Sequence, residues 1–250
     1  MGLYVEARVR ADLDALWDRT QDPAQRPRWD LRFTEITRLP GTEGEPRRFR
    51  YATRVLPFLR VSGTGISAGE KERPDGTRTS ALRFASPHPL SPIAGGGGYF
   101  RYVPDGDGVR FLTGYDYRPR GGVLGALADR LLLRPLMGWA TAWSFDRLRL
   151  WLERGITPER ALRNWLAELL VRALVLTAGC AGLGLGSFVP LFGSLAPTVA
   201  FLFPLLLLVA MALALLKAPL PGTPAARRCR RTAPARARAP RLLCTLAHPS

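Results

Sequence analysis

The segment Leu3–Trp17, LYVEARVRADLDALW, decides the fold of the amino-terminal half of the chain. Its first part places Val5, Ala7 and Val9 on one face, which is the period of a half-buried β-strand. Asp12 then stands where the N-cap of a helix is expected, directly before the apolar residues that end the segment. The segment therefore predicts a domain that begins with a strand leading straight into a short helix.

The elements expected after this segment are one more short helix and then strands. Asp22-Pro23 opens a helix that ends near Trp29. Strand-like runs separated by turns follow at residues 33–39, 47–56, 59–70, 77–85, 99–103 and 109–117. The turn PDGDG at 104–108 joins the last two runs as a hairpin. A long helix from about Val123 to Glu153 closes the domain.

This succession resembles the helix-grip fold of the START-like, or SRPBCC, superfamily, which includes polyketide cyclases, plant pathogenesis-related allergens and lipid-transfer domains. The resemblance covers about Leu3 to Glu153 and is carried by residues 5–17, by Arg28-Trp29-Asp30 with the next strand, and by the terminal helix. It implies an α+β domain over residues 1–153, in which a curved antiparallel sheet wraps around a long carboxy-terminal helix with a cavity between them. The activities of this superfamily range over binding, transport, cyclisation and hydrolysis, so the fold alone selects none of them.

Such a cavity implies an apolar ligand and a largely aromatic wall. The candidates for this wall are Trp29, Phe33, Tyr51, Phe100, Arg101, Tyr115, Trp139 and Trp143. For each aromatic residue the alternative is ordinary core packing. Further polar candidates are Asp30, Arg54 and Asp116. A charged group aimed inward is costly unless it is paired or bound to a ligand, so the alternative for these residues and Arg101 is the outer, solvated face of the sheet.

Catalytic and metal-binding groups have little support in the sequence. Asp30, Arg101 or Tyr115 would be the residues for proton transfer in a cyclase-like enzyme, but no spacing requires that role. The two histidines, His88 and His248, have no Cys, His or carboxylate at ligand spacing, and we expect no metal and no cofactor.

The glycine and cysteine patterns also indicate no functional site. The glycine run at 95–98 lacks the Lys-Ser/Thr of a phosphate-binding loop and predicts a flexible turn before a strand. The three cysteines, Cys180, Cys229 and Cys244, form no disulfide framework.

The carboxy-terminal part contains a long apolar run. From Ala173 to Leu216 the chain has no charged side chain, and basic residues stand at both ends. One membrane-spanning helix needs about 20 apolar residues, so this run is about two crossings long. Residues 192–194, between two prolines, predict the turn. We expect a transmembrane helical hairpin with helices at 173–191 and 195–216. The alternative, a buried helical pair, would need protein on all sides.

Basic residues predict the orientation of this hairpin. Arg160, Arg163 and Arg172 precede it, five basic residues follow it up to Arg231, and its turn carries no charge. Because loops rich in Lys and Arg stay inside, we expect a multi-pass protein of the cell (inner) membrane with both termini cytoplasmic. The first ten residues lack the apolar stretch of a secretory signal. Arg far outnumbers Lys, and with abundant Ala, Gly and Pro this composition is typical of a GC-rich bacterial genome.

Two further segments complete the organisation. Residues 154–172 predict an amphipathic linker helix at the bilayer surface, and the alternative is an extension of the first crossing. Residues 217–250 contain eight basic residues, no acidic residue and no hydrophobic period, which predicts a disordered basic tail. This tail either binds anionic lipid headgroups or only fixes the topology. With half of the formal charge of +16 in the tail, the charge does not indicate nucleic-acid binding.

The sequence thus favours a binding protein over an enzyme. We expect a membrane-tethered cytoplasmic domain that binds a hydrophobic small molecule or lipid between the sheet and the terminal helix. A tether raises the effective concentration of a ligand that partitions into the bilayer. One alternative is an aromatase-like or cyclase-like enzyme acting on a membrane-associated polyketide or isoprenoid-like intermediate. Another is a grip fold filled by its own side chains, in a structural or regulatory protein.

Overall fold

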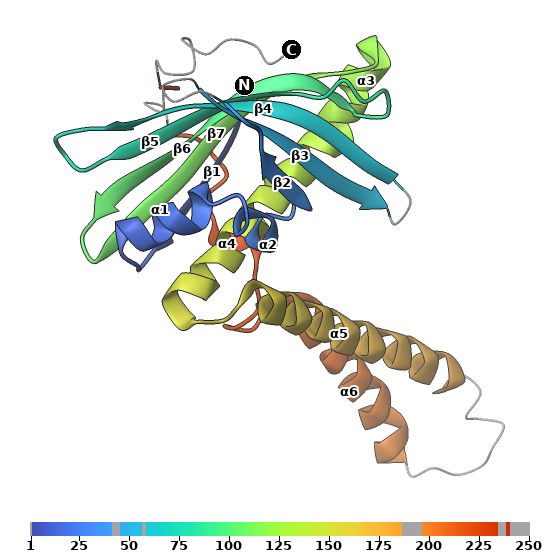
Figure 1. Cartoon of the computed structure of the whole chain (residues 1–250). Coiled ribbons are helices and arrows are strands. Elements are labelled where there is room, and N and C mark those ends of the chain that lie inside the picture. Colours follow the sequence, from blue (N-terminus) through green and yellow to red (C-terminus); the bar gives the residue numbers. More distant parts are fainter. Residues whose placement is uncertain (1, 42–45, 57–58, 187–196, 235–238, 241–250) are drawn as a thin grey trace. The chain divides into compact units, whose positions relative to one another are not determined.

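A computed structural model describes residues 2–41, 46–56, 59–186, 197–234 and 239–240 (Figure 1). The chain divides into two compact units. The first comprises Met1–Pro158 together with Ala225–Ser250, and the second comprises Glu159–Pro224. The first unit contains a sheet with its helices, and the second contains two apolar helices.

The sheet of the first unit has seven strands in the order β1-β7-β6-β5-β4-β3-β2 (Figure 1). Every neighbouring pair is antiparallel. The strands are β1 (Leu3–Val9), β2 (Glu35–Arg38), β3 (Arg47–Leu56), β4 (Leu59–Glu72), β5 (Arg78–Ala85), β6 (Ile93–Asp105) and β7 (Gly108–Pro119). The α+β class and the antiparallel sheet predicted from the sequence are confirmed.

The helices begin with the two short ones that the sequence predicts. They are α1 (Leu13–Gln21), whose N-cap Asp12 accepts hydrogen bonds from two backbone amides, and α2 (Arg26–Trp29). The expected long helix is divided into α3 (Gly122–Ala128), a π-helical turn (Asp129–Leu133) and α4 (Arg134–Arg154). Pro135 lies at the start of α4 and has no amide hydrogen for a continuous α-helix, which accounts for the break.

The core of the first unit lies between α4 and strands β1, β7 and β6. Phe145 of α4 stacks on Phe111 of β7, with ring centroids 4.3 Å apart, and Phe111 stacks on Tyr102 of β6 at 5.0 Å. The Tyr115 hydroxyl lies 3.0 Å from Thr141 Oγ1 on the same face of α4. These contacts place the long helix against the sheet as the helix-grip order implies.

The glycine run at 95–98 lies inside β6 rather than in a turn, so that prediction was wrong. A Cβ atom at Gly96 would lie 2.3 Å from the carbonyl oxygen of Asp116, and one at Gly98 would lie 2.6 Å from Tyr115 Cβ. The glycines are therefore required by the close approach of β7 and its tyrosines.

The expected disorder of residues 217–250 does not hold for the segment that follows Pro224. Cys229 is buried and its Sγ donates to the carbonyl of Ala142, 3.2 Å away, while Arg230 exchanges two backbone hydrogen bonds with Glu6. A short 3-10 helix, η3 (Ala226–Arg228), lies against α4. The composition of this segment did not predict its order. Its small residues and Cys229 are enough to pack against α4, whose surface complements them. Residues 235–238 and 241–250, with Cys244 and His248, lie outside the described residues.

The second unit consists of α5 (Pro158–Gly186) and α6 (Pro197–Leu216), and the expected turn at 192–194 falls outside the described residues. The two helices pack closely and run antiparallel, because a Cβ at Gly179 would lie 2.5 Å from Met211 Sδ and one at Gly182 would lie 2.7 Å from Leu207. Helix α5 begins at Pro158, not at 154, and joins the rest of the predicted linker helix (154–172) without a break to the described part of the predicted first crossing (173–191).

One helix in the described part of the chain, Pro158–Gly184, is long and apolar enough to cross a membrane by length and composition. The described side chains of α6 begin at Leu202 and form a shorter apolar helix, Leu202–Leu216. Both helices expose large apolar side chains, among them Leu170, Leu174, Leu206 and Leu213.

Candidate functional site

A cavity of about 60 Å³ opens in the first unit between the α1–α2 segment and strands β2 to β6. Five of the described residues that line it are apolar, namely Pro23, Ile36, Phe49, Leu82 and Phe100. The polar lining comprises Gln21, Ser67 and Ser80 together with Arg26, Arg38, Arg47 and Arg48. The lining therefore includes four arginines and, among the described residues, no carboxylate.

Half-buried aromatic side chains extend this surface along the same side of the sheet. Phe49 and Tyr51 of β3 lie over Gly65 and Gly63 of β4, where any Cβ would collide with their rings. The Tyr51 ring meets Phe33 at 5.7 Å and Phe84 at 6.4 Å, both edge to face. Burial raises the pKa of Tyr51 to about 12. None of these rings is fully buried, so the cavity continues into an aromatic surface that is partly open.

The structure brings three of the predicted cavity residues to this region. Phe100 lines the cavity, and Phe33 and Tyr51 belong to the aromatic surface beside it. Trp29 is fully buried instead, where its Nε1 donates to the carbonyl of Arg19 at 2.9 Å and its ring meets Phe145 at 6.3 Å. Tyr115 is buried beneath α4. These two residues serve the core, which was the alternative considered for each of them.

The two tryptophans of α4 lie away from the sheet. At 100° per residue, Trp139 and Trp143 are roughly 160° to 200° around the helix from Thr141, which contacts β7. Their rings stack on each other at 6.3 Å, and Arg147 lies over Trp143 at 5.3 Å. The structure therefore does not place them in the cavity wall, where the sequence predicted them. Helical spacing alone did not show which face of α4 meets the sheet.

The remaining polar candidates also lie outside the cavity. Arg101 follows Phe100 on β6 and points to the opposite face, where its guanidinium lies 5.2 Å from the Tyr99 ring. Arg54 and Asp116 are exposed. Strand alternation places Phe100 and Arg101 on different faces, so only one of the two can line the cavity.

One of the lining arginines, Arg26, belongs to a buried charged cluster with Asp30 and Arg32. Asp30 is fully buried, and Arg32 holds its carboxylate with two side-chain hydrogen bonds of 2.8 and 2.7 Å. The backbone amide of Arg32 adds a third at 3.2 Å. Arg26 Nε stands 3.6 Å from Asp30 Oδ2 and donates no hydrogen bond among the described residues. Arg26 and Arg32 thus share the single carboxylate of Asp30, and Arg32 takes its hydrogen-bonding positions.

Arg26 is the member of this cluster that reaches the cavity. Its side chain is 13 % exposed, and its guanidinium lies 4.8 Å from the ring centroids of both Phe33 and Phe100. Such cation–π contacts offset part of the cost of burying the charge, by about 0.5 to 2 kcal/mol each. Sequence reasoning selected Asp30 and Phe100 but missed Arg26, which no pattern distinguished from its neighbours Arg28 and Arg32.

Electrostatics distinguish the three members. Burial would raise the pKa of Asp30, but the charge and hydrogen bonds of Arg32, together with the charge of Arg26, lower it below its usual value. Burial lowers the pKa of Arg32, but the charge of Asp30 and its hydrogen bonds outweigh burial and raise it. Burial lowers the pKa of Arg26, and Asp30 compensates only in part. Asp30 is thus an anion at neutral pH, and Arg26 is the cation with the weaker partner.

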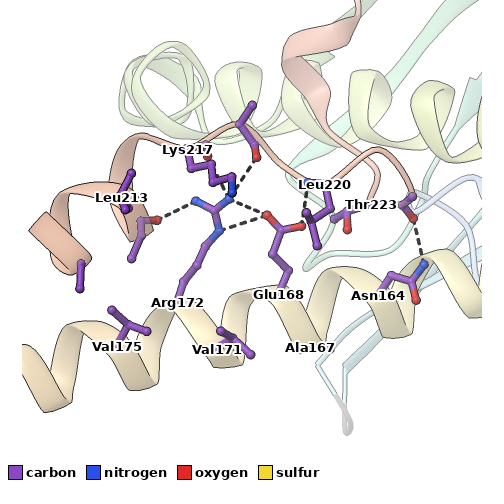
Figure 2. Close-up of a pocket in the computed structure, with 14 residues that line it drawn as sticks. Asn164, Ala167, Glu168, Val171, Arg172, Val175, Leu213, Lys217, Leu220 and Thr223 are labelled. Carbon is purple, nitrogen blue, oxygen red and sulfur yellow. Dashed lines mark hydrogen bonds and ion pairs between the residues drawn. The ribbon is translucent and has the colours of Figure 1, made fainter.

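A second, larger groove of about 730 Å³ lies within the second unit, between α5 and the chain that leaves α6 (Figure 2). Arg172 donates to the carbonyls of Ala214 at 2.6 Å and Lys217 at 2.9 Å and pairs with Glu168 at 2.6 Å (Figure 2). Asn164 donates to the carbonyl of Gly222 at 3.0 Å. The polar side chains of α5 thus hold the chain after α6, and this role accounts for their position.

The sequence matches no protein-family model. It is 48 % identical over 163 residues to a Bacillus subtilis (strain 168) protein named "Uncharacterized membrane protein YndG", a match that covers 65 % of this chain. The chain spans 61 % of the length of that relative.

Three solved structures are similar in fold. The STAR-related lipid transfer protein of Xanthomonas axonopodis is 20 % identical, with a TM-score of 0.46 over 60 % of this chain and 85 % of that one. Human StAR-related lipid transfer protein 5 is 16 % identical, with a TM-score of 0.45 over 60 % and 74 %. A START superfamily protein from Mycobacterium smegmatis is 18 % identical, with a TM-score of 0.40 over 55 % and 91 %. None of these TM-scores reaches 0.5, and nothing about the ligand of this chain follows from them.

Proposed function

We propose that this chain is a membrane-tethered member of the START-like superfamily whose helix-grip domain binds a hydrophobic small molecule or lipid. The observation that carries the proposal is the cavity between the α1–α2 segment and β2 to β6, with the half-buried aromatic rings beside it. Large aromatic rings are normally buried in the core of a domain that has no ligand. Here Phe33, Phe49 and Tyr51 remain partly open at one connected surface.

The size of the cavity determines how a ligand would be held. About 60 Å³ accommodates the end of a molecule, whereas a pocket that encloses a drug-sized ligand has about 300 to 1,000 Å³. We therefore propose that one end of the ligand enters beside Phe100 and that the rest lies along the aromatic surface of Phe49 and Tyr51. Outward movement of these half-buried rings would enlarge the site.

We also propose that α5 and α6 form a two-span transmembrane hairpin with both termini cytoplasmic. Support comes from the antiparallel packing at Gly179 and Gly182, from the exposed apolar side chains of both helices, and from the arginines that flank them. The part of α5 before residue 173 would lie at the cytoplasmic surface. The anionic lipid headgroups of the membrane are the proposed partners of Arg227 and Arg231, which are exposed.

The alternative, a cyclase-like enzyme acting on a membrane-associated polyketide or isoprenoid-like intermediate, has less support. Asp30 would be its acid or base, but the lowered pKa and the two side-chain hydrogen bonds from Arg32 leave it a poor proton donor at neutral pH. Tyr115 has its hydroxyl engaged with Thr141. A binding role requires neither residue to exchange a proton.

Photocrosslinking tests the proposal on the full chain. The protein would be placed in nanodiscs of phosphatidylcholine with a long-chain lipid probe that carries a diazirine, illuminated, and digested for peptide mass spectrometry. We expect labelled peptides from the cavity lining, around Phe49 and Phe100, in addition to bilayer labelling of α5 and α6. Labelling confined to α5 and α6 would contradict a ligand site in the domain.

A further inference from the structure

We infer that the ligand is an anionic amphiphile, with an acidic group such as a carboxylate or phosphate that is held by Arg26 and an apolar part that lies on the aromatic surface. This inference rests on the proposed function and adds the chemical class of the ligand to it. The observation behind it is the charge of the cavity, which no purely hydrophobic ligand would require.

The first argument is the position of Arg26 in its cluster. Arg32 occupies both carboxylate oxygens of Asp30, and its backbone amide takes a further position on Oδ1. Arg26 Nε is left 3.6 Å from Oδ2, beyond the range of a good hydrogen bond. A buried donor without an acceptor is costly to maintain. An anion entering the cavity would supply that acceptor and the missing negative charge together.

The second argument is the register of the strands at the mouth of the cavity. Arg38 of β2 pairs directly with Phe49 of β3, so both side chains lie on the same face of the sheet. Alternation along β3 places Arg47 on that face as well and Arg48 on the other. Arg38 and Arg47 are exposed and line the cavity with Arg26. Arg38 and Arg47 thus lie at the rim on the face of the sheet that carries Phe49, and Arg26 of α2 lies deeper in the same cavity.

The third argument is the apolar part of the lining. Phe100 lies directly against the Arg26 guanidinium, and Leu82 and Phe49 line the same cavity. A small inorganic anion would gain nothing from this surface, whereas an alkyl or aromatic tail would bury apolar area at about 25 cal/mol per Å². The juxtaposition of one deep cation with these side chains therefore fits a molecule that has both an acidic and an apolar end.

A pair of probes that differ only in charge tests this inference on the full chain in phosphatidylcholine nanodiscs. One probe is a diazirine-bearing long-chain fatty acid, and the other is its methyl ester. We expect the acid to label the cavity peptides about tenfold more strongly than the ester, once both are normalised to labelling of α6, because a hydrogen bond to a charged group is worth about that factor. Excess dodecyl phosphate should compete with the acid, and excess inorganic phosphate should not.

Matched variants locate the effect. Arg26→Met should remove the preference for the acid while leaving ester labelling of the cavity peptides, which also shows that the site is still folded. Arg60→Met is the control, because Arg60 is exposed and pairs with Glu35 outside the cavity lining. If Arg26→Met does not fold, Arg38→Met at the rim should reduce the preference in its place.

The outcomes separate the inference from the proposal beneath it. Equal labelling by acid and ester in the wild type would overturn the anionic ligand and leave hydrophobic binding intact. Competition by inorganic phosphate as strong as that by dodecyl phosphate would overturn the amphiphile. An equal loss of preference in Arg60→Met would overturn the role of Arg26. Labelling of α5 and α6 alone by both probes would overturn the proposed function itself.

Discussion

Asp30 and Asp146 are two fully buried carboxylates of the same unit, and their hydrogen-bond partners differ. Arg149 contacts Asp146 Oδ1 on α4 through a hydrogen bond from Nε and an ion pair with Nη2, each at 2.7 Å, and Oδ2 accepts from the Ala225 amide at 2.8 Å and from Arg228 at 2.9 Å. Each oxygen has two close donors, and the cluster is complete. At Asp30, Arg32 contacts both carboxylate oxygens, but the second arginine, Arg26, stands 3.6 Å from Oδ2 and lines a cavity.

This difference distinguishes a structural cluster from the cluster that we propose for ligand binding. At Asp146 the second arginine and the amide come from the segment after Pro224, so the carboxylate fastens that segment to α4. At Asp30 both arginines come from residues within four positions in the sequence, so the carboxylate itself ties no distant segment to the domain. The proposed anionic ligand would give the cavity-facing Arg26 the acceptor that Asp146 gives to Arg228.

The largest loss of folding stability is expected when Asp146 is replaced. Asp146→Ala removes the acceptor of two arginines and one amide, and breaking such a buried pair costs about 3 to 5 kcal/mol. Thermal unfolding of the full chain in detergent would measure the loss. Asp107→Ala is the matched control, because Asp107 pairs with Arg8 at 2.8 Å but is 68 % exposed, and such pairs contribute about 0 to 1 kcal/mol. Equal losses in the two variants would show that the cluster at Asp146 is not structural.

A somewhat smaller effect is expected at Asp30, with a pH dependence. The pKa of Asp30 is lowered in the folded chain, so its contribution to stability is present above the unfolded pKa of about 3.9 and is lost as pH falls through the folded value. Asp30→Asn should cost about 2 to 3 kcal/mol at pH 7, the value of the charge on its hydrogen bonds.

The same variant should also weaken the acid limb of the stability curve. Thermal midpoints between pH 7 and pH 2 would measure both effects. A curve for Asp30→Asn that runs parallel to the wild type down to pH 2 would contradict an ionised Asp30.

A third effect, on local opening, is expected where the segment after Pro224 meets α4. Burial, with the charge of Asp146, raises the pKa of the Cys229 thiol to about 12, so this thiol reacts slowly at neutral pH unless the segment detaches. Arg228→Ala removes one of the two side-chain partners of Asp146 and should accelerate maleimide labelling of Cys229 about tenfold, which corresponds to about 1.4 kcal/mol. The experiment uses a chain in which Cys180 and Cys244 are replaced by serine. Unchanged labelling would show that the segment is held by other contacts.

Short-range patterns in the sequence were sufficient for the architecture. The alternation of Val5, Ala7 and Val9 and the N-cap at Asp12 each have a local physical cause, and both are found in the structure. The glycines at 96 and 98 were misread because their cause, the backbone of β7, is distant in the sequence. The tryptophans of α4 were misplaced for a related reason. Amphipathic spacing identifies a helix, but here two faces of α4 are covered, one by the sheet and one by the segment after Pro224.

The charged clusters were beyond sequence reasoning for a different reason. The chain has so many arginines that position alone does not single out Arg26 or Arg228. What distinguishes them is the number of acceptors within reach, and that depends on strands and helices far apart in the sequence. Asp146 was not selected at all, because a single carboxylate within a helix has no pattern. A buried charged cluster can be identified only when the residues packed around it are known.

The smallest loss of folding stability is expected when Arg26 is replaced. This variant tests the difference between the Asp30 and Asp146 clusters most directly. Replacing an arginine at Asp146 should cost stability, because Arg228 completes a cluster. Arg26→Met should instead change the free energy of unfolding by less than about 1 kcal/mol. The methionine keeps apolar contact with Phe33 and Phe100, and the variant removes a charge whose burial cost and repulsion from Arg32 oppose its attraction to Asp30. Thermal unfolding of both variants in the same detergent would compare them. A loss at Arg26→Met as large as that at Arg228→Ala would mean that Arg26 is structural, and the difference between the two carboxylates would vanish.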